Sequence, residues 1–283
     1  MKLKKLAFCG CFLAFELMLA YAETLIPLPF PAGVKLGLAN TAAVTMLYAT
    51  DLFSAIFVSL IRVVLSGILF TNPVTVIYGA AGAVLSLVGM YFLIKLSAGT
   101  LTVSVCGALL HNAAQLFVAC LMTSSASILL YAPVLVISAI VCGAAVAVIC
   151  IGIKKPLARF ADTSGMVFFS KKDIVFYAAF ALFIGGCSAA LLSGRDTAYV
   201  TVRENGKVIA TYPLDRDFET VIETEYGSNT LSVKDGVCRV TDSDCPNGDC
   251  LKMKIDKNGG MIVCLPHRLS VTAENSDADA VTG

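Results

Sequence analysis

"ILLYAPVLVISAIVCGAAVAVICIGI", residues 128–153, contains no charged side chain and is followed directly by two lysines. A helix that crosses the hydrocarbon core of a membrane needs about 20 predominantly apolar residues. This stretch is long enough to span on its own. It decides the class of fold, because a helix that is apolar on every side must lie in lipid or in a protein core.

Further apolar runs fill the chain up to residue 193, and seven of them are candidate spans: 5–22, 38–50, 52–70, 74–94, 102–124, 128–153 and 173–193. The run at 38–50 is too short to span alone and must borrow from the loop before it. Only 14% of all residues are charged, against about a quarter in soluble domains. We predict an all-α polytopic membrane bundle with six core helices in residues 1–155 and a seventh, tethering helix at 173–193.

Basic side chains gather in the loops on one side of this bundle. Lysine and arginine in short loops stay in the cytoplasm. With the N-terminus inside, only Lys35 falls in a short outer loop, and nine others face the cytoplasm: Lys2, Lys4, Lys5, Lys95, Lys154, Lys155, Arg159, Lys171 and Lys172. We expect a multi-pass protein of the cytoplasmic membrane, with residues 156–172 as a cytoplasmic basic loop and the tail on the extracytoplasmic side.

The N-terminal run "MKLKKLAFCGCFLAFELMLAYAE", residues 1–23, is open to another interpretation. A basic head, an apolar middle and a small-residue site such as "AYA" are typical of a cleaved secretory signal. Glu16 interrupts the apolar middle, and further spans follow directly. We therefore favour a first membrane helix.

"ETLIPLPFPAGVKLGLAN", residues 23–40, breaks the apolar pattern with three prolines. Proline removes a backbone donor and fixes its φ angle, so this stretch cannot continue a helix. Irregular backbone at membrane depth is tolerated where protein buries it or a water-filled cavity lies beside it. We interpret residues 27–37 as an outer loop that folds over a cavity, with Lys35 and Asn40 near its mouth. A plain connecting loop is the alternative.

Arg62, in "SLIRVVLSG", lies near the middle of a predicted span. A charge there costs about 3 kcal/mol unless it faces protein or water. One interpretation is a structural ion pair with an acid at a helix end, such as Asp51 or Glu23. The other is a cation directed at an anionic group of a ligand.

"GALLHNAAQLF", residues 107–117, is a second polar cluster inside a span. His111 and Gln115 are four residues apart and share a helix face, with Asn112 beside them. A packed, hydrogen-bonded histidine is the structural alternative to a ligand contact. The predicted substrate-binding residues are Lys35, Asn40, Arg62, His111, Asn112 and Gln115. Small residues at three- and four-residue steps in "YGAAGAVLSLVGMYF", residues 78–92, predict close helix packing.

Taken in order, "ETLIPLPFPAGVKLGLAN", "RVVLSGILF", "YGAAGAVLSLVGM" and "GALLHNAAQ" resemble the heptaprenyl diphosphate synthase component I family, also called the Gx transporter family, over about residues 5–155. That family is similar in layout to the substrate-capture (S) components of energy-coupling-factor importers. The resemblance implies a small-molecule ligand, anionic or isoprenoid, and a coupling subunit with ATPases as partners. The synthase name implies instead a catalytic prenyl synthase as partner, in the making of menaquinone side chains.

The residues argue against catalysis by this chain. Prenyl transfer needs paired aspartate-rich motifs that hold Mg²⁺ and diphosphate, whereas Asp51 is the one aspartate in residues 1–160. No Walker motif is present either. We predict that the chain is not an enzyme and has no cofactor. Its expected role is an importer-type binding subunit, or alternatively a non-catalytic membrane component of heptaprenyl diphosphate synthesis.

The tail changes to short alternating runs, which predict a small, mostly β domain over residues 195–273. Asn205-Gly206 and Asp235-Gly236 are hairpin-turn pairs. We expect residues 274–283 to be disordered. "SDCPNGDC" and "GGMIVCLPHRLSV" resemble the second domain of the NusG family in a membrane-tethered, cysteine-containing version. The tail carries more acids than bases, so we expect no nucleic-acid binding.

Four cysteines fall in the tail: Cys238, Cys245, Cys250 and Cys264. In a small domain outside the cytoplasm, an even set indicates two disulfides. Cys238 lies outside the pattern of the resembling family, so the pairing stays open, and our prediction contains no metal ligand. A zinc site is one alternative. The other is a redox or assembly module, in which His267 and Arg268 lower the pKa of an exposed thiol.

Overall fold

The computed structural model describes residues 2–25, 37–70, 73–124, 128–129, 132–178, 197–246, 248–257 and 259–275. The chain divides into two compact units. The helical unit takes in residues 1–29, 34–115 and 134–187, and the second unit takes in 30–33, 116–133 and 188–283. The second unit contains the β domain.

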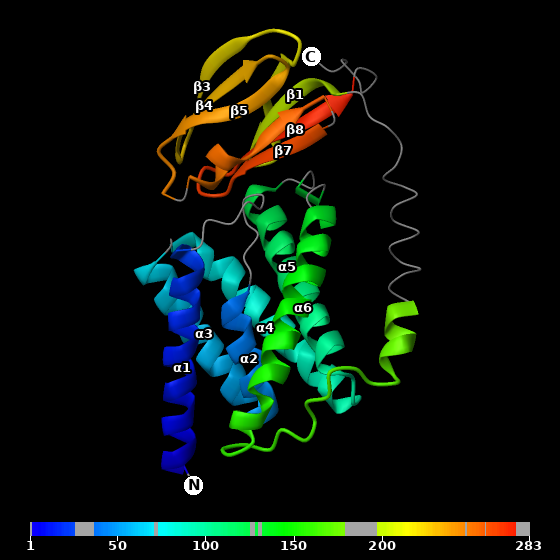
Figure 1. Ribbon diagram of the computed structural model, residues 1–283. Coiled ribbons are helices and arrows are strands. Elements are labelled where there is room, and N and C mark those ends of the chain that lie inside the picture. The colour runs from blue at the N-terminus through cyan, green and yellow to red at the C-terminus, as the bar shows by residue number, and fades with distance from the viewer. Residues whose placement is uncertain are drawn as a thin grey trace. The chain divides into compact units, whose positions relative to one another are not determined.

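Six α-helices occupy the first part of the chain (Figure 1): α1 Lys2–Leu25, α2 Leu38–Ala49, α3 Leu52–Leu69, α4 Pro73–Lys95, α5 Thr100–Thr123 and α6 Ala132–Leu157. In the described residues, five of them are long and apolar enough to cross a membrane, and α2 is too short. The predicted all-α membrane bundle is therefore confirmed. Residues 173–178 are helical and begin the predicted seventh span; its remainder, like the proline-rich residues 27–36, lies outside the described residues.

Helix α2 forms much of the core of the helical unit. Eight of its 12 residues are buried, and it contacts α1, α3 and α4. Val44, Met46 and Leu47 belong to the buried cluster, while the Thr45 hydroxyl lies 3.6 Å from the Cys150 sulfur of α6. The short length of α2 and its small residues allow it to be enclosed by longer helices.

Helices α4, α5 and α6 approach one another at glycines. A Cβ at Gly82 of α4 would come 2.8 Å from the His111 ring of α5, and one at Gly143 of α6 would come 2.7 Å from the Val105 backbone of α5. These distances are shorter than van der Waals contact, so a larger residue at either position would force its neighbour to shift. The small residues of α4 therefore pack against helices, as their spacing predicts.

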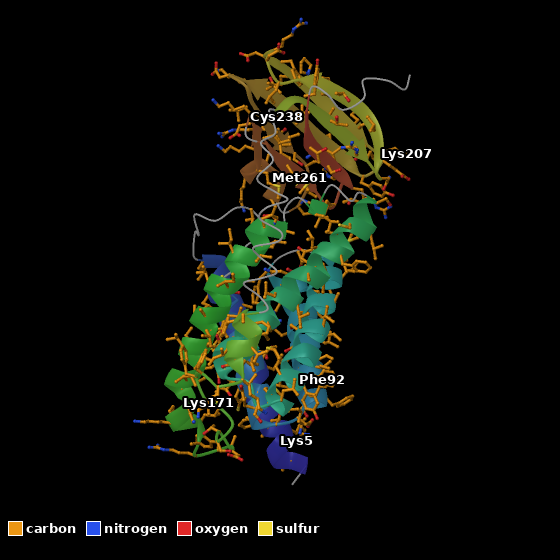
Figure 2. The ribbon with its side chains drawn as sticks, turned by 90° about the vertical axis from the view of Figure 1, so that its right-hand side faces the viewer. Lys5, Phe92, Lys171, Lys207, Cys238 and Met261 are labelled. Atoms are coloured by element: carbon orange, nitrogen blue, oxygen red, sulfur yellow. The ribbon has the colours of Figure 1, made fainter. Side chains whose placement is uncertain are left out.

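Several basic side chains of the helical unit lie at one end of its helices. Figure 2 places Lys5 and Lys171 at the same end. Lys5 contacts Asp51 in the α2–α3 turn at 2.6 Å, and Lys172 donates to the Leu96 carbonyl after α4. The loop expected at 156–172 packs back onto the start of α5, where the Thr100 amide donates to the Val167 carbonyl. This common end agrees with one set of loops on one side of a membrane.

The β domain is one antiparallel sheet in the order β2-β1-β8-β7-β6-β5-β4-β3. Its strands are β1 Thr197–Glu204, β2 Lys207–Pro213, β3 Phe218–Thr224, β4 Gly227–Lys234, β5 Val237–Ser243, β6 Lys254–Asp256, β7 Gly259–Cys264 and β8 Leu269–Asn275, with a 3₁₀ helix, η2, at Asp249–Lys252. The β prediction for the tail is confirmed. Strand β8 extends to Asn275. The expected start of the disordered tail at residue 274 is therefore two residues too early, and residues 276–283 lie outside the described part.

Both predicted hairpin turns are present. Asn205 and Gly206 join β1 to β2 with φ angles of 48° and 78°, and Asp235 and Gly236 join β4 to β5 with φ angles of 51° and 73°. Two consecutive positive φ angles are typical of a type I′ turn, which matches the right-handed twist of the flanking strands. The sheet encloses a core that includes all four cysteines of the tail.

Candidate functional site

An ion pair lies between α1 and α3, inside two of the candidate spans. The Arg62 Nε atom is 3.2 Å from the Glu16 Oε2 atom, and their side chains are 12% and 0% exposed. The Ser59 hydroxyl, one turn before Arg62, donates to the other Glu16 oxygen at 3.5 Å. Nε and Oε2 are close, but they do not meet hydrogen-bond geometry. The contact is therefore an electrostatic one between two desolvated groups.

This pairing corrects the structural alternative for Arg62, which named Asp51 or Glu23. Asp51 caps the N-terminus of α3, accepting from the Ser54 amide at 3.1 Å, and pairs with Lys5. Glu23 accepts from the Leu38 amide and so caps α2. Both acids stabilise helix ends, where free backbone amides need acceptors. Glu16 is instead at the same depth as Arg62.

The polar cluster on α5 is divided between two neighbouring helices. The His111 ring packs against Gly82 of α4. The Asn112 side chain donates to the Leu135 carbonyl of α6 at 3.0 Å, and Gln115 is partly buried. In the described residues, these contacts of His111 and Asn112 are with neighbouring helices.

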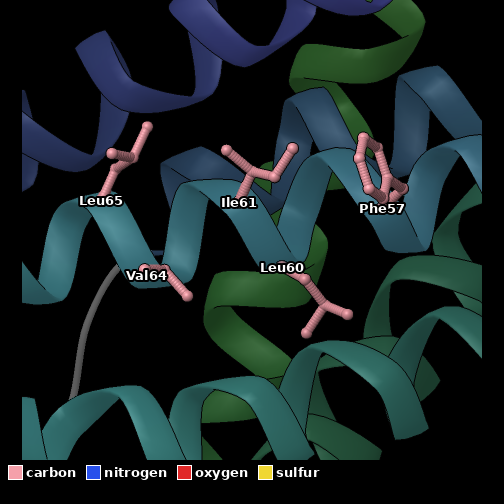
Figure 3. A pocket seen from close by; sticks show the side chains of 5 residues that line it. All are labelled: Phe57, Leu60, Ile61, Val64 and Leu65. Atoms are coloured by element: carbon pink, nitrogen blue, oxygen red, sulfur yellow. The ribbon is translucent and has the colours of Figure 1, made fainter.

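The proposed mouth of the cavity is only partly described. Asn40 lies in the first turn of α2, where its backbone N–H donates to the Gly37 carbonyl at 2.9 Å. Lys35 lies outside the described residues. A hollow of about 310 Å³ lies along α3 (Figure 3), lined by Phe57, Leu60, Ile61, Val64 and Leu65. All five are apolar, and none is a predicted site residue, so this hollow adds no polar binding group.

A second candidate site is in the β domain. The sulfur atoms of Cys245, Cys250 and Cys264 lie within 4.8 Å of one another, and all three residues are buried. We call these three residues the cysteine cluster. Cys245 and Cys250 have their sulfurs 3.5 Å apart, compared with about 2.05 Å in a disulfide bond. Cys238 is buried on β5 outside the cluster, and every cysteine of the described residues carries a free thiol.

Asn229 of β4 connects the cysteine cluster to His267. Its amide nitrogen donates to the Cys250 sulfur at 3.6 Å and to the Ser243 hydroxyl at 2.9 Å. Its carbonyl oxygen lies 2.7 Å from the Nδ1 atom of His267, and the His267 Nε2 atom is 3.1 Å from an Asp244 oxygen. Asn229 and His267 are both buried, so this network is ordered from both sides.

Hydrogen bonding separates the acidities of the clustered thiols. The Cys264 thiol donates to the Cys250 sulfur, and this bond, together with the Ser243 and Cys245 contacts, lowers the pKa of Cys250 against the opposing effect of burial. The same bond and burial raise the pKa of Cys264. Burial alone raises the pKa of Cys238 to about 12. The clustered thiols therefore differ in acidity, whereas Cys238 behaves as an apolar core residue.

The fold and these two sites define a polytopic helical membrane protein that carries a cysteine-containing β domain. Residues 12–152 match the family model described as heptaprenyl diphosphate synthase component I, and residues 174–277 match the one described as NusG domain II. The two matches, in this order, confirm the two family resemblances that the motifs indicate. The second match begins at residue 174, so it includes the region of the predicted tethering helix.

A solution NMR structure of the protein Lin0431 from Listeria innocua is 26% identical to this chain, covering 31% of this chain and 82% of that one with a TM-score of 0.27. No curated protein sequence matches the chain.

Sequence reasoning missed Glu16 as a site residue, although it noted that this acid interrupts an apolar run. A usable signal was present, because Glu16 and Arg62 are the mid-span acid and the mid-span cation of the predicted helices. Opposite charges inside a membrane protein usually pair. It also missed Asn229, whose role depends on strand pairing and has no local signature.

Proposed function

We propose that the helical unit is a membrane-embedded subunit that binds a small molecule, of the substrate-capture type. The observation that carries this proposal is the buried Glu16–Arg62 pair. Ionisable residues within spans are expensive and usually mark the path or site of a ligand. A plain anchor or scaffold needs no such pair, since apolar residues of similar volume pack equally well there.

The geometry of the pair also indicates how a ligand binds. Because Arg62 Nε and Glu16 Oε2 lack hydrogen-bond geometry, the Nε–H group can form a better hydrogen bond to another acceptor. A carboxylate or phosphate group presents two oxygens to the planar guanidinium and would compete with Glu16 for it. An anionic head with an apolar body fits this charge and the apolar helices around it.

A second candidate function is a non-catalytic membrane partner of a prenyl diphosphate synthase. The family match at residues 12–152 favours it, because the family is described as component I of such a synthase. The paucity of aspartate in residues 1–160 is consistent with chemistry on another subunit. Both functions require binding of an anionic molecule, and they differ in the partner.

A tagged purification from gently solubilised native membranes tests these functions, with proteins and small molecules identified by mass spectrometry. A coupling subunit with ATPases supports the importer role, and a prenyl synthase subunit supports the second. Recovery of neither, with no bound anion, would refute both. The matched control is the Glu16→Leu, Arg62→Met double variant, which we expect to keep its protein partners and lose the small molecule.

We also propose that the basic end of the helical unit faces the cytoplasm and the β domain the other side. The common location of Lys5 and Lys171 supports this orientation. Single cysteines introduced at the exposed Ser164 and Lys207 positions, in a background with Cys11 replaced, test it with a membrane-impermeant maleimide on intact cells. We expect labelling at position 207 only. Labelling at 164 only would reverse the orientation.

A further inference from the structure

Neither proposed function uses the cysteine cluster of the β domain. We propose that Cys245, Cys250 and Cys264 bind one thiophilic d¹⁰ metal ion, Zn²⁺ or Cu⁺, through three sulfurs. The inference is independent of the ligand and partners of the helical unit, since it concerns residues of one compact domain.

The sulfur spacing fits one shared ion. With metal–sulfur bonds of about 2.3 Å, two thiolates on one ion lie about 3.8 Å apart in tetrahedral geometry and about 4.0 Å apart in trigonal geometry. The Cys245–Cys250 separation is 3.5 Å, and all three sulfurs lie within 4.8 Å of one another. The three atoms can therefore reach an ion at their centre through small side-chain rotations.

Three neighbouring thiols fit a metal better than they fit a disulfide. One disulfide would use two of the sulfurs and leave the third thiol buried against it, ready for exchange. A metal ion uses all three. Soft thiolate ligands select Zn²⁺ and Cu⁺ over hard cations such as Mg²⁺ and Ca²⁺, so the donor set defines the class of ion.

The ligands come from two separate segments of the chain that the fold brings together. Cys245, which follows β5, and Cys250 of η2 form a C-x4-C pair, while Cys264 ends β7. Cys264 and His267 form a C-x2-H pair in the turn before β8, where the His267 backbone amide hydrogen-bonds the Cys264 sulfur. Close cysteine and histidine pairs on two loops are typical of metal sites in small domains.

Neighbouring polar groups orient the cluster as an outer shell does around a metal. Asn229 donates to the Cys250 sulfur, and the Ser243 hydroxyl accepts from the Cys245 amide at 3.2 Å. Donors to sulfur stabilise negative thiolates, and such contacts fix ligand geometry. Asp244, with a side chain that is 60% exposed beside His267, provides a polar route from solvent.

Binding at this site involves no oxidation or reduction. Each ligating thiol loses its proton to solvent and forms a sulfur–metal bond, so up to three protons leave per ion bound. The charge of the ion does not change. The fourth position of Zn²⁺ would be filled by solvent or by His267 after rotation, and trigonal Cu⁺ needs no fourth ligand.

The test uses the full chain, purified in detergent under nitrogen with a non-thiol reductant and loaded separately with Zn²⁺ alone or Cu⁺ alone. After desalting, metal content is measured by plasma mass spectrometry, and free thiols are mapped by alkylation and peptide analysis. We expect about one ion per chain and protection of the three clustered cysteines, reversed by a chelator. The ion that needs the higher chelator concentration for its removal is the one that the site prefers.

The variant Cys264→Ser should lower the affinity for metal at least about 10-fold, in line with the loss of one ligand. The matched control is Cys238→Ala, a buried cysteine of the same domain outside the cluster, which should keep one ion. If Cys264→Ser fails to fold, chelation and reloading of the wild-type chain decides alone. Equal metal in both variants, or reduced wild-type chains that bind neither ion, would overturn the proposal.

Discussion

Replacement of Arg62 by methionine tests whether the buried ion pair stabilises the helical unit. At 3.2 Å, the attraction between the two charges is about 5 kcal/mol with an effective dielectric constant of about 20. Desolvation of both groups offsets much of that gain, but removal of one partner leaves the other charge buried alone. Loss of one member of a buried pair costs about 3–5 kcal/mol. We expect a loss in this range for Arg62→Met.

The two single variants should differ, because only one of the two remaining groups can be neutralised. In Arg62→Met, Glu16 can take a proton, whereas in Glu16→Leu the guanidinium of Arg62 keeps its charge. Glu16→Leu should therefore be the more destabilised variant. The double variant Glu16→Leu, Arg62→Met should recover to within about 1 kcal/mol of the wild type, because two apolar side chains replace the pair.

Reversible unfolding in mixed micelles with increasing dodecyl sulfate, followed by circular dichroism, measures all four proteins. If both single variants are as stable as the wild type, the reasoning is refuted. It is also refuted if the double variant is no more stable than the less stable single variant. Either result would mean that the charges are solvated and do not interact across α1 and α3.

Gly82→Ala should destabilise the helical unit by about 1–3 kcal/mol, because its Cβ would come 2.8 Å from the His111 ring. The control is Gly152→Ala, since a Cβ there meets no atom within 4 Å. Equal melting temperatures of the two variants would contradict the close packing. Asp51→Ala removes the cap of α3 and should cost about 1 kcal/mol in the same micelle unfolding assay; Asp51→Asn should lose less, and equal losses in the two variants would contradict the capping role. Asn229→Ala leaves buried partners unsatisfied and should cost about 1–3 kcal/mol, measured by the thermal melting of the β domain signal; an unchanged melt would show that the network contributes nothing.

The elements themselves could be predicted closely. The run at 52–70 corresponds to α3, Leu52–Leu69, and the Asn205-Gly206 and Asp235-Gly236 pairs mark turns as expected. These are local properties: the length of an apolar run, the missing Cβ of a glycine in a turn, and the alternation of apolar and polar residues along a strand. Each depends on residues that are neighbours in the chain, so the order of residues is sufficient to reveal them.

The site could be predicted only in part. Arg62 was singled out because a mid-span charge is conspicuous, but Asp51 and Glu23 were named as partners, and Glu16 is the one it contacts. Helical periodicity shows which residues share a face and leaves open which helix that face meets. The division of His111 and Asn112 between α4 and α6 was hidden for the same reason.

The sequence by itself determined that apolar helices precede a small β domain, because hydropathy and turn chemistry are carried residue by residue. Only the tertiary structure decided that Glu16 meets Arg62, and that Cys245, Cys250 and Cys264 gather while Cys238 stays apart. Those meetings follow from how helices rotate against one another and from the sheet order that brings the end of β7 beside η2. Both are set by packing summed over the whole fold, which no single stretch of chain encodes.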